Sequence, residues 1–235
     1  AKVAIPDRYS YLKVAQARSQ IVRNDQQEPQ QVITLEFTDD IDRDELLGKL
    51  KVFVLPNANN RYWSGPRQVT AAVLKESPPV SLEMIDNPRQ AAKLYNFIIN
   101  VDQDRQLYLR IGEGLTSIND FVHSSFYDTV LRAADYPQEI SIMGEGAMLS
   151  RSGAHQLSLL ARGLKAVKVD VGKLLPQQIN HLVSQSRGDI KDGYFSNYNF
   201  DENNITALNE QILPLQKIHP AKANYAAVDL SSYLP

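Results

Sequence analysis

The most acidic segment of the chain has a spacing of carboxylates that could bind calcium. Asp40, Asp42 and Asp44 stand at alternate positions, as the first ligands of an EF-hand loop do. The rest of that pattern is missing, because Glu45 stands where the loop needs a glycine and Lys51 stands where it needs a bidentate glutamate. We therefore interpret this segment as a solvated loop followed by a short helical turn, and we expect no metal ion there.

Two glycine pairs match the opening of a dinucleotide-binding fingerprint, Gly112 with Gly114 and Gly144 with Gly146. The third glycine is absent from both. Neither pair begins a helix in a βαβ unit, so no helix N-terminus would be available to hold a pyrophosphate. We interpret them as turn glycines that adopt a positive φ, and we expect no cofactor.

One hydroxyl and one imidazole lie close together in the sequence, at Ser152 and His155. A nucleophile needs a base within hydrogen-bond reach and a third group that orients the base, but the G-x-S-x-G pattern is absent and both residues fall at a predicted turn. The histidines lack the short spacing of a zinc-binding pair; they are His123, His155, His181 and His219. The chain has no cysteine, which removes thiol nucleophiles and thiolate sites. We expect no catalytic set and no enzyme activity.

Tyr62 and Trp63 form an aromatic pair in a polar loop, residues 57–68. Aromatic loop residues can mark a binding surface. They can also fold back onto the domain that carries the loop, which is the interpretation we favour.

The composition excludes several classes of protein. The chain has 235 residues, 43% of them hydrophobic and 22% charged, with a net charge of −2. Nucleic-acid binding needs clustered excess basic charge, so we expect no nucleic-acid partner. No apolar run approaches the ~20 residues of a membrane-spanning helix.

The elements that must position these residues are mostly strands. Alternating apolar residues predict them at residues 32–37, 50–55, 69–74, 80–85, 94–101, 107–111, 139–143, 155–161, 166–171, 194–200, 205–213 and 225–230. Residues 1–31 look irregular, and residues 102–104 look like a hairpin turn. One helix is predicted at 175–185. The pattern indicates two tandem antiparallel β-sandwich domains of immunoglobulin or fibronectin-III type, 1–135 and 136–235, with one short helix in the second. They would join near Tyr136, which Pro137 holds extended.

The second half of the chain resembles a known family. Residues 135–142, 146–149 and 157–171 form a strand, a glycine turn and an apolar strand with a V-x-V continuation before the predicted helix. This series is similar to an early macroglobulin-like domain of bacterial α2-macroglobulins. Upstream, residues 31–55 and 107–115 are similar to the domain that precedes it.

The resemblance implies a function for a larger protein. Such proteins are large periplasmic chains, often lipid-anchored at the inner membrane, that trap endopeptidases and protect the cell envelope; some are encoded beside a peptidoglycan synthase. Expected partners are therefore other domains of the same chain, target endopeptidases and that synthase. The family's Cys-x-x-Gln thioester cannot lie here without cysteine, and no bait segment is recognisable.

The resemblance also suggests which residues contact neighbouring domains. The loop 57–68 and the acidic segment 38–45 are the candidates, with Tyr62, Trp63, Asp40 and Asp42 as contact residues. A further strand usually follows in the family, so we expect the second domain to be incomplete at its C-terminal end and to leave a strand edge unpaired. The alternative function is a cell-surface adhesion or carbohydrate-binding β-sandwich module.

Overall fold

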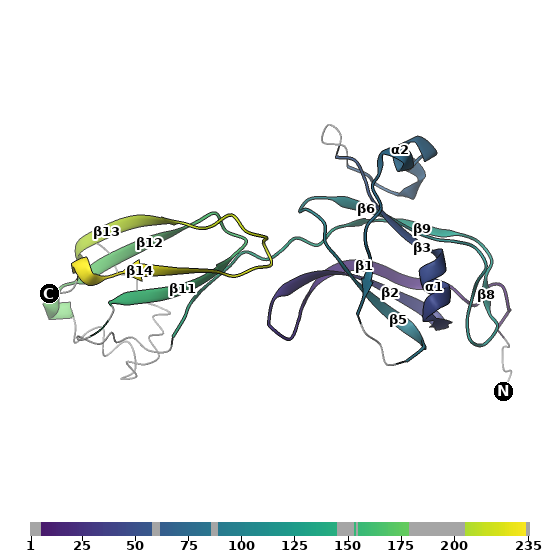
Figure 1. The fold of residues 1–235 in the computed structure, drawn as a ribbon, viewed down its shortest axis with the longest axis horizontal. Helices are drawn as coiled ribbons and strands as arrows, with labels where there is room; N and C mark the ends of the chain where they lie inside the picture. Colours follow the sequence, from purple (N-terminus) through teal and green to yellow (C-terminus); the bar gives the residue numbers. More distant parts are fainter. Residues whose placement is uncertain are drawn as a thin grey trace. The chain divides into compact units, whose positions relative to one another are not determined.

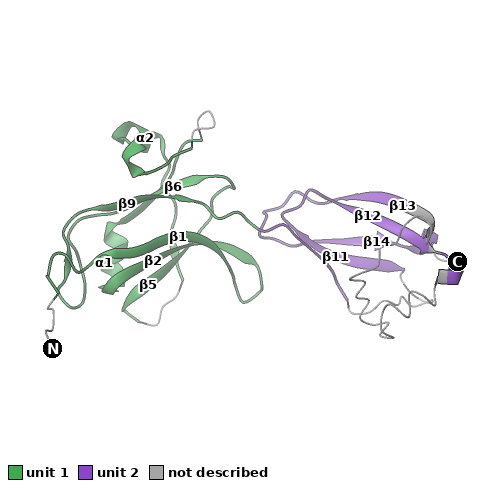
Figure 2. Cartoon of the chain, turned by 180° about the vertical axis from the view of Figure 1, so that it is seen from behind, with its two compact units in different colours: residues 1–136 green, residues 137–235 purple. Residues whose placement is uncertain are grey.

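The computed structural model describes residues 6–57, 62–85, 89–144, 153, 155–178 and 205–233. The chain separates into two compact units, residues 1–136 and 137–235, which Figure 2 shows in different colours. Every strand pair among the described residues is antiparallel. The predicted class, an all-β chain of antiparallel sandwich domains, is confirmed.

The first unit contains two main sheets (Figure 1). The larger sheet has the order β1-β2-β5-β4, with bounds Val14–Arg23, Pro29–Asp42, Ala91–Ile99 and Glu83–Met84. The second has the order β3-β6-β9, with bounds Leu50–Val54, Gln106–Ile111 and Tyr127–Arg132. A short pair, β7 (Leu115–Thr116) and β8 (Val122–His123), completes the strands. The helices are α1 (Arg43–Lys49), α2 (Ala71–Glu76) and the 3-10 turn η1 (Pro66–Gln68).

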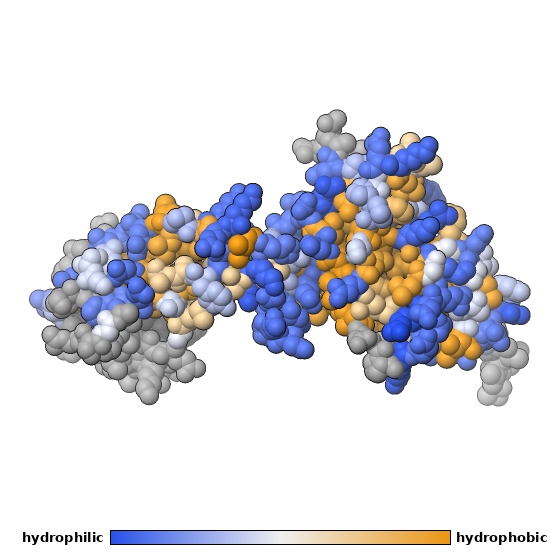
Figure 3. Space-filling view, in the orientation of Figure 1, coloured by the Kyte–Doolittle hydropathy of each residue, from blue (hydrophilic) through white to orange (hydrophobic). Residues whose placement is uncertain are grey.

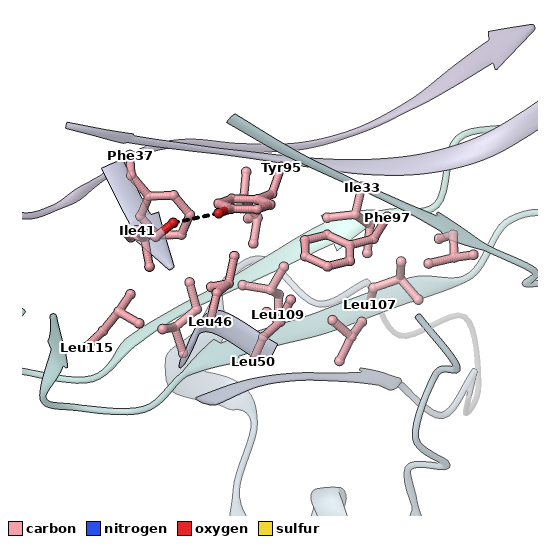
Figure 4. Packing of buried hydrophobic residues seen from close by; sticks show 14 of the residues in the cluster. Ile33, Phe37, Ile41, Leu46, Leu50, Tyr95, Phe97, Leu107, Leu109 and Leu115 are labelled. Atoms are coloured by element: carbon pink, nitrogen blue, oxygen red, sulfur yellow. Dashed lines mark hydrogen bonds between the residues drawn. The ribbon is translucent and has the colours of Figure 1, made fainter. Parts of the chain in front are cut away.

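The core of the first unit lies between these two sheets (Figure 4). Strand β2 contributes alternate apolar side chains to it, and strand β6 contributes a matching set from the opposite sheet. The main contributors from these two strands are Ile33, Leu35, Phe37, Leu107, Leu109 and Ile111, each at most 2% exposed. Burying one such side chain stabilises the fold by about 1.5–3 kcal/mol, so this face fixes the register of both strands.

A strap between β3 and β5 spans one open side of this sandwich. The chain first bonds to β3, where Val54 N donates to Pro78 O at 2.9 Å and Val80 N donates to Val52 O at 2.8 Å. It then becomes β4 and pairs with β5. Val80, Leu82 and Met84 pack against the core from the strap, and Figure 3 shows apolar side chains gathered on this face.

A buried tyrosine supplies hydrogen bonds to backbone groups at an irregularity between β2 and β5. The ladder pairs Glu36 with Leu94 and then Ile41 with Ala92, so a longer stretch of β2 opposes a shorter stretch of β5. The hydroxyl of Tyr95, a residue that is 2% exposed, donates to the carbonyl of Ile41 and accepts from Ala92 N at 3.1 Å (Figure 4). Burial raises the pKa of Tyr95, so the hydroxyl keeps its proton and satisfies both backbone groups.

We expect Tyr95→Phe to lower the free energy of unfolding by about 1–3 kcal/mol, because a buried N–H and a buried C=O lose their partner. Urea unfolding followed by circular dichroism measures this change. Tyr9→Phe is the control, since the Tyr9 side chain is 57% exposed and its loss of a hydroxyl should change stability by less than about 0.5 kcal/mol. Equal stability of the Tyr95→Phe variant and the wild type would show that the hydroxyl has no structural role.

One helix lies where the sequence analysis placed a short helical turn, and another lies where it placed a strand. The acidic segment does not begin as a loop, because residues 38–42 complete β2; the predicted helical turn is confirmed, and α1 follows at once. Asp42 caps α1, its Oδ1 accepting from Asp44 N at 2.8 Å and from Glu45 N at 3.2 Å. The predicted strand 69–74 is also wrong, because Thr70 caps α2 by accepting from Val73 N at 3.4 Å.

Two further predictions for the first unit are corrected. Residues 14–23 are not irregular but form β1, which pairs with β2 along its length. Residues 102–104 do not turn a hairpin. The strands on either side, β5 and β6, belong to different sheets, so this turn carries the chain across the sandwich.

The second unit has a three-stranded sheet of order β10-β11-β14 and a two-stranded sheet of β12 and β13 among the described residues. The bounds are Glu139–Ile142, Gln156–Arg162, Asn224–Asp229, Ala166–Leu174 and Ile205–Pro214, respectively. Its buried core is formed by Leu159, Ala161, Val167 and Val228. The predicted alternation along β12 is confirmed, since Val167 and Val169 pack into this core while Lys168 is exposed.

Of the predicted helix at 175–185, only residues 175–178 are described, and there Pro176–Gln178 forms the 3-10 turn η2. A second 3-10 turn, η3, covers Ser231–Tyr233. Both described α-helices lie in the first unit. No described helix is long and apolar enough to cross a bilayer.

The turn between β11 and β12 requires a glycine. Gly163 has a φ of +64°, and a Cβ added there would lie 3.0 Å from the carbonyl oxygen of Pro137. The first residue of the second unit therefore packs directly against this turn.

Candidate interaction surfaces

Trp63 is buried in the first unit rather than presented at its surface. The residue is 4% exposed and forms a small second core with Leu55 and Tyr108 on the outer face of the β3-β6-β9 sheet. Its indole Nε1 donates to Pro56 O at 3.2 Å. The prediction of Trp63 as a contact residue for another domain is corrected, because the ring is covered by residues of its own unit.

The backbone of Trp63 is held by a side chain that the sequence analysis did not single out. Trp63 N donates to Oε1 of Gln106 at 2.7 Å, and Nε2 of Gln106 donates back to Trp63 O at 2.9 Å. The Gln106 amide thus acts as one more residue of a β-ladder. A lone glutamine at the start of a strand carries no sequence signal for this role.

Tyr62 precedes Trp63 in the chain, but unlike Trp63 it is 71% exposed. The other end of the loop is fixed as well, because Leu55 N donates to Gln106 O at 2.8 Å and Arg105 Nη2 donates to Leu55 O at 3.1 Å. Hydrogen bonds therefore hold the chain on both sides of Tyr62, at Leu55 and at Trp63. Its contact with another domain stays a prediction.

In the same small core as Trp63, a tyrosine hydroxyl is hydrogen-bonded to a carboxylate. Tyr108 Oη donates to Asp128 Oδ2 at 2.8 Å, and Tyr108 is 4% exposed. Burial disfavours the phenolate, and the hydrogen bond to the Asp128 carboxylate disfavours it further. Together they raise the pKa of Tyr108 to about 12, from a usual value of 10.0.

This pKa predicts a loss of stability at alkaline pH. The unfolded chain releases the Tyr108 proton near pH 10 and the folded chain near pH 12, so the unfolded state binds fewer protons in that window and stability falls as pH rises through it. Below pH 10 the contribution is fully present. We expect Tyr108→Phe to flatten this part of the stability–pH curve, which urea unfolding between pH 9 and pH 11.5 measures. An unchanged slope in the variant would contradict the assignment.

The acidic end of β2 uses its carboxylates within the fold. Oδ2 of Asp42 accepts from Gln90 Nε2 at 3.1 Å, in addition to capping α1, and hydrogen bonds from Gln90 and from helix N–H groups lower the pKa of Asp42. Asp40 is half-buried, and its carbonyl accepts from Ile118 N at 2.9 Å. Contacts of Asp40 and Asp42 with another domain stay predictions. These residues lie on a different sheet from the Trp63 core.

A neighbouring carboxylate, Asp39, is the most buried of this group at 5% exposure. Both of its oxygens accept from Asn119 Nδ2 at 3.0 Å. Burial alone would raise the pKa of Asp39, but hydrogen bonds from Asn119 and Ser117 outweigh it and the pKa is lowered. Asp39 therefore stays ionised, and its hydrogen bonds link β2 to the turn before β8. The sequence pattern offered no means to separate it from the exposed aspartates.

The remaining candidate residues are dispersed. Ser152, Gly146 and His181 lie outside the described residues, and the carbonyl of His155 accepts from Leu230 N at 2.7 Å. Gly114 and Gly144 have φ of +73° and +124°, as predicted for turn glycines, whereas the prediction is wrong for Gly112, which does not have a positive φ. Across the described ranges, no group of three His, Asp or Glu side chains is placed to hold a metal ion.

The sequence is similar to known proteins along nearly the whole of this chain. No protein-family model matches it. It is 24% identical over 244 residues to an α2-macroglobulin of Rickettsia conorii, a match that covers 98% of this chain, and 24% identical over 243 residues to an α2-macroglobulin homolog of Yersinia pestis, covering 99%. The chain is similar to bacterial α2-macroglobulins along nearly its whole length.

A solved macroglobulin structure shares the fold. The crystal structure of native α2-macroglobulin from Escherichia coli spanning domains MG0-NIE-MG1 matches 95% of this chain and 62% of that one, with a TM-score of 0.50 and 14% identity. This chain spans only 13% and 12% of the lengths of the Rickettsia and Yersinia macroglobulins. The resemblance to macroglobulin-like domains is thereby confirmed in sequence and in fold.

Proposed function

We propose that residues 1–235 are a structural segment of a larger α2-macroglobulin-type inhibitor that traps endopeptidases and protects the bacterial cell envelope. The observation that carries this proposal is the continuous similarity to bacterial α2-macroglobulins along 98% of the chain. In this account both units fold as β-sandwiches and neither carries out a chemical step.

The internal use of polar side chains supports a purely structural role. The Gln106 amide binds the backbone of Trp63, the Asp39 carboxylate binds Asn119, and the Tyr108 hydroxyl binds Asp128. Catalytic groups must point toward a substrate, whereas these groups form their hydrogen bonds with other residues of the same unit. They stiffen the sandwich that neighbouring domains would contact.

The expected surroundings of the full-length protein follow from the same relationship. Its partners would be its own further domains and the endopeptidases that it traps, and its location would be the periplasm, with a lipid anchor at the inner membrane. The family resemblance adds a peptidoglycan synthase as a candidate partner. Co-purification of the full-length protein from membranes, with and without detergent, tests the anchor and this partner together.

A capture assay tests the proposed function. The full-length protein is incubated with an endopeptidase, and cleavage of a large protein substrate is compared with cleavage of a small peptide. Caging blocks access of the large substrate only, so we expect its cleavage to fall while peptide cleavage persists. The isolated 235-residue chain is the control and should change neither rate.

Loss of both activities would indicate a conventional active-site inhibitor, and no change in either would contradict the inhibitor proposal. The adhesion or carbohydrate-binding alternative predicts the second of these results.

A further inference from the structure

The N-terminal segment, residues 7–13, is held on the first unit although it forms no strand. Its carbonyl groups accept hydrogen bonds from β8 and β2. Arg8 O accepts from Val122 N at 2.8 Å, and Tyr11 O accepts from Thr38 Oγ1 at 2.7 Å. A few bonds to two strands therefore fix the whole segment.

The same segment covers apolar residues of the first unit. The side chain of Leu12 is 1% exposed and belongs to the main core. The ring of Tyr11 lies against Phe121, with the two ring centroids 4.5 Å apart. Release of the segment would expose these groups to water.

An imidazole holds the segment at Leu12. Nδ1 of His123, on β8, lies 3.1 Å from Leu12 O. A carbonyl oxygen can only accept, so Nδ1 carries the proton in this bond. The ring is half-buried, but its Nε2 is fully buried and has no hydrogen-bond partner. The neutral ring, with a lone pair on Nε2, is the form that fits this site.

The surroundings offer no acceptor for a second proton on His123. Gly114 N donates to His123 O at 2.8 Å, which places the turn 112–114 beside β8. The charged residues on the N-terminal segment, on the turns next to β8 and on α1 beyond β7 are Asp7, Arg8, Lys13, Glu45, Lys49, Glu113 and Asp120. Among the described residues, no carboxylate is bonded to the imidazole. A protonated ring would therefore bury a charge and an N–H group without a partner, which is costly.

We propose that mild acid releases residues 7–13 through protonation of His123. Imidazoles in water take up a proton between pH 5 and pH 8, and in the released state the ring can reach water and do so. The released state then binds more protons than the seated state, so seating weakens as pH falls. This device is independent of the proposed function and adds an acid-sensitive end to the first unit.

Hydrogen exchange of the 235-residue chain at pH 7.5 and pH 5.5 tests the proposal, after correction for the pH dependence of intrinsic exchange. The reporters are the amides of Val122, which donates to Arg8 O, and of Thr38, which donates to Lys13 O at 3.1 Å. The amide of Leu109, in the middle of β6, reports on the folded core. We expect protection of both reporters to fall at least tenfold at pH 5.5, with no change at Leu109.

A variant separates His123 from the other titrating groups. Asparagine at position 123 carries an N–H donor near the position of Nδ1 but does not titrate, so His123→Asn should give the same reporter protection at both pH values. His155→Asn, in the second unit, is the matched control and should keep the acid response. If His123→Asn fails to seat the segment at either pH, NMR of the His123 ring nitrogens in the wild type replaces it, and ring protonation and loss of protection should share one midpoint.

Four outcomes would overturn the proposal. Unchanged reporter protection at pH 5.5 would mean that the segment stays seated in acid. An acid response that persists in His123→Asn would assign the effect to carboxylates. Equal loss of protection at Leu109 would indicate unfolding of the whole unit, and separate midpoints for the ring and the reporters would uncouple the two events. None of these measurements involves a protease, so they are distinct from the capture assay.

Discussion

Trp63→Ala is expected to lower the free energy of unfolding of the first unit by about 3–5 kcal/mol, the usual cost of truncating a buried tryptophan. The indole is one of three buried residues in its cluster, with Leu55 and Tyr108, so its removal leaves a cavity that few neighbours can fill. Urea unfolding monitored by far-ultraviolet circular dichroism measures the change. Tryptophan fluorescence cannot be used, because Trp63 is the only tryptophan in the sequence and the variant removes it.

The adjacent residue supplies the matched control for this prediction. Tyr62 is 71% exposed, so Tyr62→Ala should change stability by less than about 0.5 kcal/mol. If the two variants were equally stable, the placement of Trp63 in a core would be wrong and the loop would regain its role as an exposed aromatic surface.

Gln31→Leu is expected to destabilise the first unit by about 2–5 kcal/mol, because two buried backbone groups would each lose a hydrogen bond worth ~1–3 kcal/mol. Gln31 is 0% exposed; its Oε1 accepts from Val101 N at 3.0 Å, and its Nε2 donates to Ala134 O at 2.8 Å. Leucine keeps the volume and removes both bonds.

The Gln31 amide also fixes the last residues of the first unit. Ala134 N is held in addition by Ser19 Oγ at 3.0 Å. Hydrogen exchange at residues 133–136 should therefore accelerate in Gln31→Leu. Gln16→Leu, on an exposed position of β1, is the control for replacing a glutamine by leucine. A variant with normal stability and unchanged exchange would show that the Gln31 amide does not hold these residues in place.

The sequence predicted strands best where burial alternates along them. The predicted strands 32–37, 50–55 and 107–111 correspond to β2, β3 and β6, with β3 ending at Val54, because one face of each enters the core. Strand β1 was missed because its solvent side carries Arg18 and Gln20, which makes the segment look polar throughout. Its pairing with β2 is long-range, and no local pattern records it.

The errors around α2 and the candidate site have a different origin. Val69, Val73 and Leu74 favour a strand by side-chain type, but the Thr70 cap and packing beneath Trp63 favour the helix that forms. Tyr62 and Trp63 were identified as a pair, yet their opposite burial depends on Gln106, which is distant in sequence. Sequence spacing cannot report such a contact.

The central claim is that this chain acts as folded architecture in a protease-trapping protein, and capture measured on the full-length protein with Trp63→Ala tests it most directly. Capture of an endopeptidase is followed across temperature for the wild type, Trp63→Ala and Tyr62→Ala. The account predicts that capture by Trp63→Ala is lost at the lower temperature where its first unit unfolds, while Tyr62→Ala follows the wild type. Full capture by Trp63→Ala after that unit has unfolded would contradict it.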